Sequence, residues 1–430
     1  MRMILTWVVV AAASAMAADE DPTDVLIRLR EQVLSHSERI PNYTCVETIH
    51  RDRYESAVDA PKTCDDLVAR RKQPNFPLMV RLTTSDRLRL DVALAADGEI
   101  YSWAGAAKFE EKDIDELIPD GAMGTGPFAT MLLGVFVGRP PRFVYEGDTI
   151  LDHRIVYQYS YRVEREDSRY RVKARGEWTI TGYDAMLWVD PKTAELLRLD
   201  VHTDELLPAT SLCQTNTSLE FGMVQLKGQD FLLPKATKQR FIGREGSESE
   251  NQVTFAKCRE FKGESTVSFG ERSAAPEHAK ATPLPEAAFP PNLPVSVDLA
   301  TAIDDNAAAG DQIDGRLAKP IRDAKGAVLL AEGAVLHGRL MRVEIRHGKR
   351  PESVLSIRWE TVEMGDARKA ISLLPNRRIG DLKAVPGVLR QRGIQIELPP
   401  TSDVEYGVYH FPGEHVALYA GFRTEWVTLR

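Results

Sequence analysis

A long succession of strand-forming segments, joined by short turns, occupies the middle of this sequence. The segments are rich in β-branched and aromatic residues, and they lie at 142–145, 154–165, 170–181, 187–189, 196–202, 214–225, 231–242 and 250–261. Between them, Asp190-Pro191-Lys192-Thr193 places a proline early in a β-turn, and Lys227-Gly228-Gln229-Asp230 supplies a glycine where the chain reverses. Strands separated by such short turns pair antiparallel, so the pattern predicts a meander and not a parallel sheet with crossover helices.

The part of the chain before the meander predicts a helix, a hairpin and a second helical region. Asp21 can cap a helix, Pro22 suits the first helical position, and apolar residues then recur at helical spacing to about residue 37. Strands are predicted at 43–49, 87–92 and 99–103, the last two as a hairpin around the turn at 95–98. Residues 113–118 and the apolar run 128–137 indicate helices, the second of them buried.

Residues 1–17 have the layout of a secretory signal peptide. A basic start precedes an apolar stretch, and Ala15-Met16-Ala17 is a small-x-small site, so cleavage is expected between Ala17 and Ala18. The apolar stretch is shorter than the roughly 20 residues that a membrane span needs, and no later window offers one. We therefore expect an exported protein, in the periplasm or outside the cell, with no transmembrane span in the mature chain. A cytosolic helix at the start is the alternative.

The chain has four cysteines, Cys45, Cys64, Cys213 and Cys258. In an exported protein an even number of cysteines indicates disulfides, whereas a zinc site would need ligand spacings that this sequence lacks. We expect the pairs Cys45–Cys64 and Cys213–Cys258, because each pair lies within one local segment. The other two connectivities stay open.

Composition divides the mature chain into two units. Residues 273–294 are rich in proline and alanine and are predicted to be a linker. It separates a sheet domain at 18–272 from a β-rich domain at 295–430, whose closely spaced glycines suit a small barrel or sandwich. The predicted fold class is therefore mainly β (α+β). A formal net charge of −8 argues against nucleic acid as a partner, because phosphate contacts need a basic face.

The hairpin Trp-Val-Asp-Pro-Lys-Thr at 188–193, with the strand that follows it, resembles the corresponding turn of LolA-like periplasmic lipoprotein carriers. The order of helix, strands, helical insert and meander over 21–269 is also similar to theirs. The resemblance implies that the antiparallel sheet curves into an open half-barrel with helices covering its hollow face, and that the ligand is a lipid or a lipoprotein acyl chain. The stretch 41–49 resembles a segment of uncharacterised exported bacterial proteins, which implies no activity.

In the second unit, residues 310–317, 326–330 and 333–339 are similar to the β-barrel of outer-membrane core scaffold proteins of type IV secretion. This resemblance implies a shared barrel architecture only.

The sequence contains no nucleophile elbow, zinc-protease motif or nucleotide-binding fingerprint. We therefore assign no catalytic residue, no cofactor and no metal ligand. Weaker alternatives are a loop metal site at His410, Glu414 and His415, a general-base pair of His202 and Asp204, and carboxylates within 110–116. Each of these has an ordinary structural explanation as a strand end or a solvated surface.

The most suggestive surface is apolar. The run 128–137 is expected to lie over the hollow of the curved sheet and to leave a cavity suited to an acyl chain, to which each buried CH₂ contributes roughly 0.8 kcal/mol. Its expected lining consists of Trp103, Phe128, Met131, Leu132, Val135, Phe136, Trp178 and Trp188. We therefore expect a non-catalytic binding protein of the cell envelope. The alternatives are an envelope scaffold that docks protein partners without a small ligand and, third, an envelope hydrolase.

Overall fold

The structure is a computed structural model of the chain, and its fold is mainly β, as predicted. It describes residues 20–95, 98–106, 109, 114–118, 123–124, 135–136, 140–174, 177–260, 289–365, 367–376, 395–397 and 407–429. The predicted signal peptide and its cleavage site at Ala17 and Ala18 lie outside these residues. So do residues 273–288 of the predicted linker.

Helix α1 (Pro22–Arg39) begins as the sequence predicts. The Asp21 carboxylate accepts a hydrogen bond from the Thr23 N–H at 2.7 Å, and Pro22 occupies the first turn. The buried face of the helix is formed by Val25, Leu29 and Val33. Its other side is held by the predicted Asp190–Thr193 turn, because Arg28 and Gln32 donate to backbone carbonyls of that turn. The turn therefore fixes the helix against the sheet.

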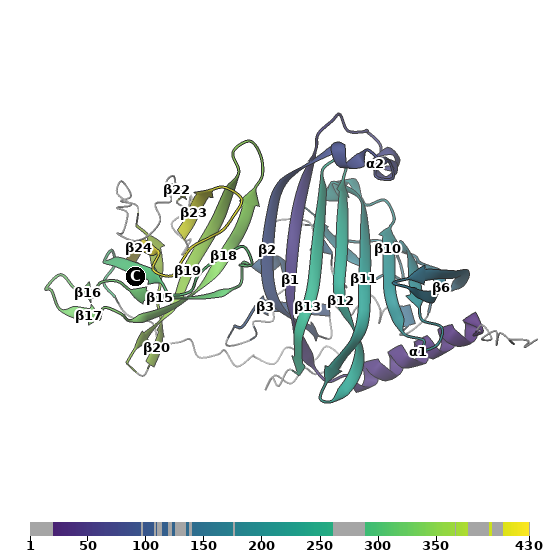
Figure 1. Ribbon diagram of the computed structural model, residues 1–430, viewed down its shortest axis with the longest axis horizontal. Coiled ribbons are helices and arrows are strands. Elements are labelled where there is room, and N and C mark those ends of the chain that lie inside the picture. The colour runs from purple at the N-terminus through teal and green to yellow at the C-terminus, as the bar shows by residue number, and fades with distance from the viewer. Residues whose placement is uncertain are drawn as a thin grey trace, which may run out of the picture.

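Over the described residues, ten antiparallel strands form the sheet of the first unit, and the first of them along the chain, β1, pairs with the last strand of the meander, β13. Across the sheet they are β5 (Val144–Leu151), β6 (Arg154–Val163), β9 (Tyr183–Val189), β10 (Leu196–Thr203), β11 (Leu212–Leu226), β12 (Gln229–Gly243), β13 (Glu248–Glu260), β1 (Tyr43–Ser56), β2 (Val80–Ala95) and β3 (Gly98–Trp103). Figure 1 shows the sheet curving from β2 round to β6, with α1 along its lower end. Bulges in several ladders assist this bend.

One predicted strand of the meander, 170–181, is not a single strand and does not belong to the main sheet. The segment 170–181 is a hairpin of β7 (Arg171–Ala174) and β8 (Glu177–Ile180), and it pairs with β4 (Met123–Gly124) in a separate three-stranded sheet. The alternating pattern is real in both halves, but the chain reverses between them. The described part of the unit also contains the short helices α2 (Cys64–Arg70) and α3 (Ile114–Leu117) and the 3₁₀ turns η1 (Phe76–Leu78) and η2 (Pro208–Thr210).

The second unit is built of short antiparallel strands around one apolar core that contains the T-shaped pair Trp359 and Trp426. Its strands are β14 (Pro294–Leu299), β15 (Gln312–Leu317), β16 (Ile321–Arg322), β17 (Val328–Leu330), β18 (Val335–Arg346), β19 (Glu352–Met364), β20 (Ala367–Ala370), β21 (Leu373–Pro375), β22 (Gln395–Glu397), β23 (Gly407–Pro412) and β24 (Arg423–Thr428). The pairings within the described part of the chain do not close this sheet into a barrel.

The two units share backbone hydrogen bonding. Strand β18 pairs with β2 at residues 344–346 and 84–86, so the sheet of the second unit continues that of the first (Figure 1). Beside this ladder, Arg89 forms an ion pair with Asp311, and the buried Arg339 donates to the Ala104 carbonyl at 2.9 Å. The predicted domain boundaries remain a prediction, but the contact between the units is extensive.

All four cysteines form disulfides, as predicted, but the predicted pairing is wrong. The bridges are Cys45–Cys258 and Cys64–Cys213. Cys45 and Cys258 lie on β1 and β13, which are neighbours in the sheet although 213 residues separate them in the chain. Cys64 begins α2, which packs on β11 beside Cys213. The prediction of local pairs failed because β1 and β13, which are far apart in the chain, are neighbours in the sheet and bring distant cysteines together.

Candidate functional site: the two faces of the first sheet

One face of the first sheet is covered by α1 and by short segments, and it is called the covered face below. Its side chains form straight rows across the strands, because directly opposite residues in adjacent antiparallel strands point to the same side. One row consists of Tyr159, Leu187, Leu199, Leu219, Thr237, Val253, Ile49 and Leu88. The next row consists of Tyr161, Ala185, Val201, Thr217, Gln239, Asn251, Arg51 and Asp86. The second row changes from apolar to polar at β11.

The apolar end of the covered face lies beneath α1. Val135 and Phe136, both predicted to line a cavity, belong to this cluster and are each 1% exposed. The Phe136 ring stacks on Phe143 at 5.7 Å. The Tyr159 hydroxyl donates to the Pro22 carbonyl at 2.7 Å, which ties the start of α1 to the sheet. Burial raises the pKa of Tyr161 well above its usual value, so this phenol stays neutral. In this structure the end beneath α1 is tightly packed.

The polar end of the covered face carries hydrogen-bonding side chains that are also buried. Arg51 donates to both carboxylate oxygens of Asp86 at 2.7 Å, a bidentate pair between β1 and β2. On β11, Thr217 shares a hydrogen bond of 2.9 Å with Tyr170. The Thr237 hydroxyl, by contrast, is buried and has no hydrogen-bond partner among the described residues. Most buried polar groups in folded proteins have a partner, so Thr237 is an exception that needs a reason.

Glu47 is a second exception on the same face. It lies on β1 opposite Phe255 and Leu90, is 6% exposed, and its Oε2 has no hydrogen-bond partner among the described residues. Burial, and then the nearby Glu99 carboxylate, raise the pKa of Glu47 well above its usual value. Glu99 accepts a hydrogen bond from Tyr101 at 2.8 Å. Burial therefore favours the protonated form of Glu47, and a protonated carboxyl can both donate and accept a hydrogen bond.

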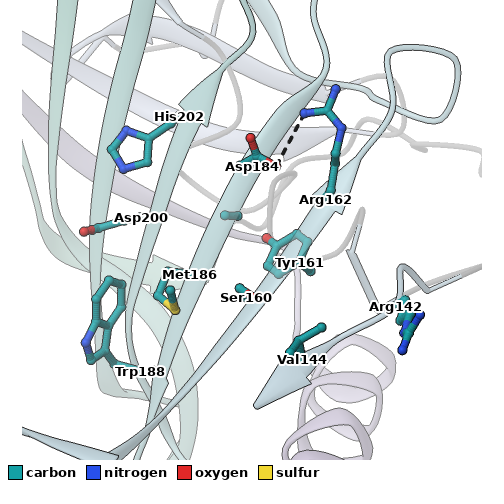
Figure 2. A pocket seen from close by; sticks show the side chains of 11 residues that line it. Arg142, Val144, Ser160, Tyr161, Arg162, Asp184, Met186, Trp188, Asp200 and His202 are labelled. Carbon is teal, nitrogen blue, oxygen red and sulfur yellow. Dashed lines mark ion pairs between the residues drawn. The ribbon is translucent and has the colours of Figure 1, made fainter. Parts of the chain in front are cut away.

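The opposite side of the same strands, the outward face, has a hollow of about 640 Å³ over β5, β6, β9 and β10. Figure 2 shows Trp188, Met186 and Asp184 along β9, with Asp200 and His202 on one side and Ser160 and Arg162 on the other. The ion pair drawn there joins Arg162 to Asp184 at 3.4 Å. Asp204 and Glu164 also contact Arg162, and hydrogen bonds to them raise its pKa further above its usual range.

The predicted tryptophans do not share one cavity. Trp103 is buried in the apolar cluster at β1–β3, and Trp178 lies on the small separate sheet, where it packs at the border of that cluster. The predicted place of Trp188 is corrected by the structure: its side chain points to the outward face, while its neighbours Leu187 and Val189 point into the core. Strand alternation could have revealed this from the sequence. Phe128, Met131 and Leu132 lie outside the described residues, so a cavity beneath the 128–137 segment stays a prediction.

The weaker catalytic and metal alternatives are not assembled. His410, Glu414 and His415 have separate partners, which are Glu352, His347 and Asp305 respectively. His202 contacts Asn216 while Asp204 contacts Arg162. Within the described ranges no three histidine, cysteine or acidic side chains are placed to share a metal ion. The carboxylates at 110–113 lie outside the described residues.

Sequence reasoning missed the polar row and the junction. Thr217, Gln239 and Asn251 alternate with polar neighbours, so nothing in the local pattern distinguishes covered from outward positions there. The pairing of β18 with β2 joins segments more than 250 residues apart, and no local signal marks it. Over the part of the chain that is described, no helix is both long and apolar enough to cross a bilayer.

No protein-family model matches this chain, and no curated protein matches its sequence. Among solved structures, one described as an outer membrane lipoprotein-sorting protein domain from Vibrio parahaemolyticus is 11% identical, covers 56% of this chain and 94% of its own, and has a TM-score of 0.29. A DUF1329 family protein from Desulfovibrio piger is 12% identical over 55% and 93%, with a TM-score of 0.23. MucB is 12% identical over 91% of both chains, with a TM-score of 0.15. These scores are too low to bear on function.

Proposed function

We propose that this protein is an exported, non-catalytic binding protein of the cell envelope that holds an amphipathic lipid or an acyl-bearing partner on the covered face of its first sheet. The observation that carries the proposal is the second row of that face, which changes from apolar residues beneath α1 to the buried polar residues Thr217, Gln239 and Asn251, while the first row beside it stays apolar except at Thr237. An amphiphile has the same two-part character. The two disulfides fit a protein that works in an oxidising compartment.

The buried atoms without partners support the same proposal. A permanently closed core seldom leaves a hydroxyl and a carboxyl oxygen without hydrogen bonds, because each such group costs about 1–3 kcal/mol. Thr237 and Glu47 both lie on the covered face, on either side of the apolar residues Val253 and Ile49. A guest with hydroxyl, ester or amide groups would supply the missing partners and place its chain over the apolar residues.

The tight packing beneath α1 sets a condition for binding. Leu187, Leu199 and Phe136 are no more than 1% exposed, so a guest reaches them only when the cover shifts. At its start α1 is held by polar links, because Tyr157 and Tyr159 donate to the carbonyls of Glu20 and Pro22. We propose that α1 moves as a unit when the guest enters.

The test compares an obstructed covered face with a matched control. The mature protein is purified without detergent from its native envelope, and bound lipid is measured by native mass spectrometry. Val253→Trp fills the covered face, whereas Thr254→Trp adds the same ring to the exposed side of the same strand. We expect bound lipid in the natural protein and in T254W and its loss in V253W, with circular dichroism reporting that each variant is folded. Equal lipid in V253W, or none in the natural protein, would overturn the proposal.

A second candidate, an envelope scaffold that docks a protein partner, is favoured by one observation. Among the described pairings β5 is an edge strand bonded only to β6, and its hairpin exposes Val144, Tyr145, Ile150 and Ile155. Exposed apolar edge strands are unusual in monomeric proteins, because they invite pairing with another chain. A pull-down that compares the natural protein with the Ile150→Lys variant tests this function separately from lipid binding, because the substitution leaves the covered face unchanged.

A further inference from the structure

The hollow on the outward face of the same strands lies across the sheet from the covered face, although Tyr161 and Ala185 of the second row also border it. The hollow of about 640 Å³ is lined from β5, β6, β9 and β10 and by Arg142, which precedes β5, so regular strands fix the positions of all but one of its side chains. Its floor can be described by rows of opposite residues, as on the covered face. Along β9 the floor passes from Trp188 through Met186 to Asp184.

The Trp188 end of the hollow is an aromatic wall held in place by charge. Arg198 lies directly opposite Trp188 on β10, and its guanidinium lies 5.0 Å from the centre of the indole ring. The same Arg198 donates to both carboxylate oxygens of Asp200 at 2.8 Å. The indole orientation is therefore set before any ligand arrives, which lowers the entropy cost of binding.

The other end of the hollow is polar. Arg162, Asp184 and His202 lie opposite one another on β6, β9 and β10. Asp184 is 69% exposed, and its contact with Arg162 leaves carboxylate lone pairs for a ligand. The Nδ1 atom of His202 pairs with the Asn216 side chain at 2.8 Å, so Nε2 is the ring nitrogen available to a ligand. Trp188 and Asp184 are four residues apart along one strand, a distance of about 13 Å.

The charges of the lining balance. The lining contains two arginines, Arg142 and Arg162, and two aspartates, Asp184 and Asp200, so its formal charges cancel and favour neither an anion nor a cation. Apolar surface comes from Val144, Met186 and Trp188 between these groups. A rigid aromatic wall, apolar floor and mixed donors and acceptors suit a neutral molecule with an apolar ring face and many hydroxyl groups. We propose that the outward hollow binds a neutral oligosaccharide of two to three sugar rings, which lies along β9 from Trp188 to Asp184.

This proposal is tested with cellotriose, chitotriose and maltotriose as probes, each titrated into the full mature protein by calorimetry and by tryptophan fluorescence. At least one probe should bind, and Trp188→Ala should weaken its binding at least about tenfold. The matched control Trp178→Ala removes a tryptophan from the separate small sheet and should leave the affinity unchanged.

A second variant tests the same site if W188A does not fold. Asp184→Asn alters only an exposed carboxylate, and it should weaken the bound probe by severalfold while thermal unfolding stays unchanged. Lack of binding by all three trisaccharides, or equal binding by the natural protein and both variants, would overturn the site. Because V253W blocks only the covered face, sugar binding that persists in V253W separates this site from the lipid proposal.

Discussion

Removal of the inner disulfide tests how the first unit is held together. In the double variant Cys64→Ala, Cys213→Ala, the unfolded chain gains the freedom that the bridge denied it. The sequence separation is 149 residues, which alone corresponds to about 5 kcal/mol in the chain-entropy relation. The outer bridge, with a separation of 213 residues, encloses the inner one. In the unfolded chain Cys64 and Cys213 are therefore also joined through the outer bridge, by a shorter path of about 64 residues (213 less 149). The expected loss of unfolding free energy is therefore about 4 kcal/mol.

Urea unfolding of the protein under non-reducing conditions measures this loss. With a urea dependence near 3 kcal/mol per molar, the midpoint should fall by roughly 1–2 M. The single variant Cys64→Ala adds a test of pairing, because it should leave Cys213 as the thiol that an alkylating reagent labels. Labelling of Cys45 instead, or a loss below about 1 kcal/mol in the double variant, would refute the connectivity and the reasoning from loop length.

Three further predictions concern the junction, the covered face and pH. Gly310→Ala should destabilise the protein by roughly 3 kcal/mol in urea unfolding, because the φ of Gly310 is +103° and a Cβ atom there would collide with the Arg89 carbonyl and Trp103. The control Gly326→Ala, at φ +87° in open space, should cost only about 1 kcal/mol. Thr237→Val should raise the stability of lipid-free protein by about 1–2 kcal/mol and reduce lipid retention, because it removes a buried hydroxyl without a partner. Burial raises the pKa of Glu248 from 4.5 to about 7, so the folded state holds a proton that the unfolded chain releases. The free energy of unfolding should therefore fall by roughly 3 kcal/mol, relative to Glu248→Gln, as the pH rises from about 4.5 to 7.

Each of these predictions has a result that contradicts it. Equal costs at Gly310 and Gly326 would mean that the close contact at the junction is not maintained in solution. A less stable T237V protein would mean that the hydroxyl has a partner within the protein. Parallel pH profiles of the natural protein and E248Q would mean that Glu248 keeps its ordinary pKa when folded.

Local structure was predictable where local chemistry decides it. Asp21 and Pro22 mark the start of α1, and the turn at 190–193 and the hairpin of 87–103 appear where their residues predict. Alternation also separates inward from outward residues, and applied to Leu187 and Val189 it would have placed Trp188 on the outward face. The prediction of Trp188 as a cavity residue ignored that alternation.

Long-range structure was not predictable in the same way. The pairing of β1 with β13 determines which cysteines meet, and it depends on how the whole meander curves. The polar row through Thr217, Gln239 and Asn251 resembles an ordinary solvated strand face, and only the sheet's curvature and cover make it an interior. The ladder of β18 with β2 likewise depends on the meeting of two separately built surfaces.

The central claim, that the covered face of the first sheet holds an amphipathic guest, is tested most directly by cross-linking. A phospholipid with a diazirine in its acyl chain is loaded onto the mature protein, photolysed, and the labelled peptides are mapped by mass spectrometry. The account predicts labels on covered-face side chains of α1, β10 and β13, such as Leu29, Leu199 and Val253. Labels confined to the outward face, or no more label than on heat-denatured protein, would contradict it.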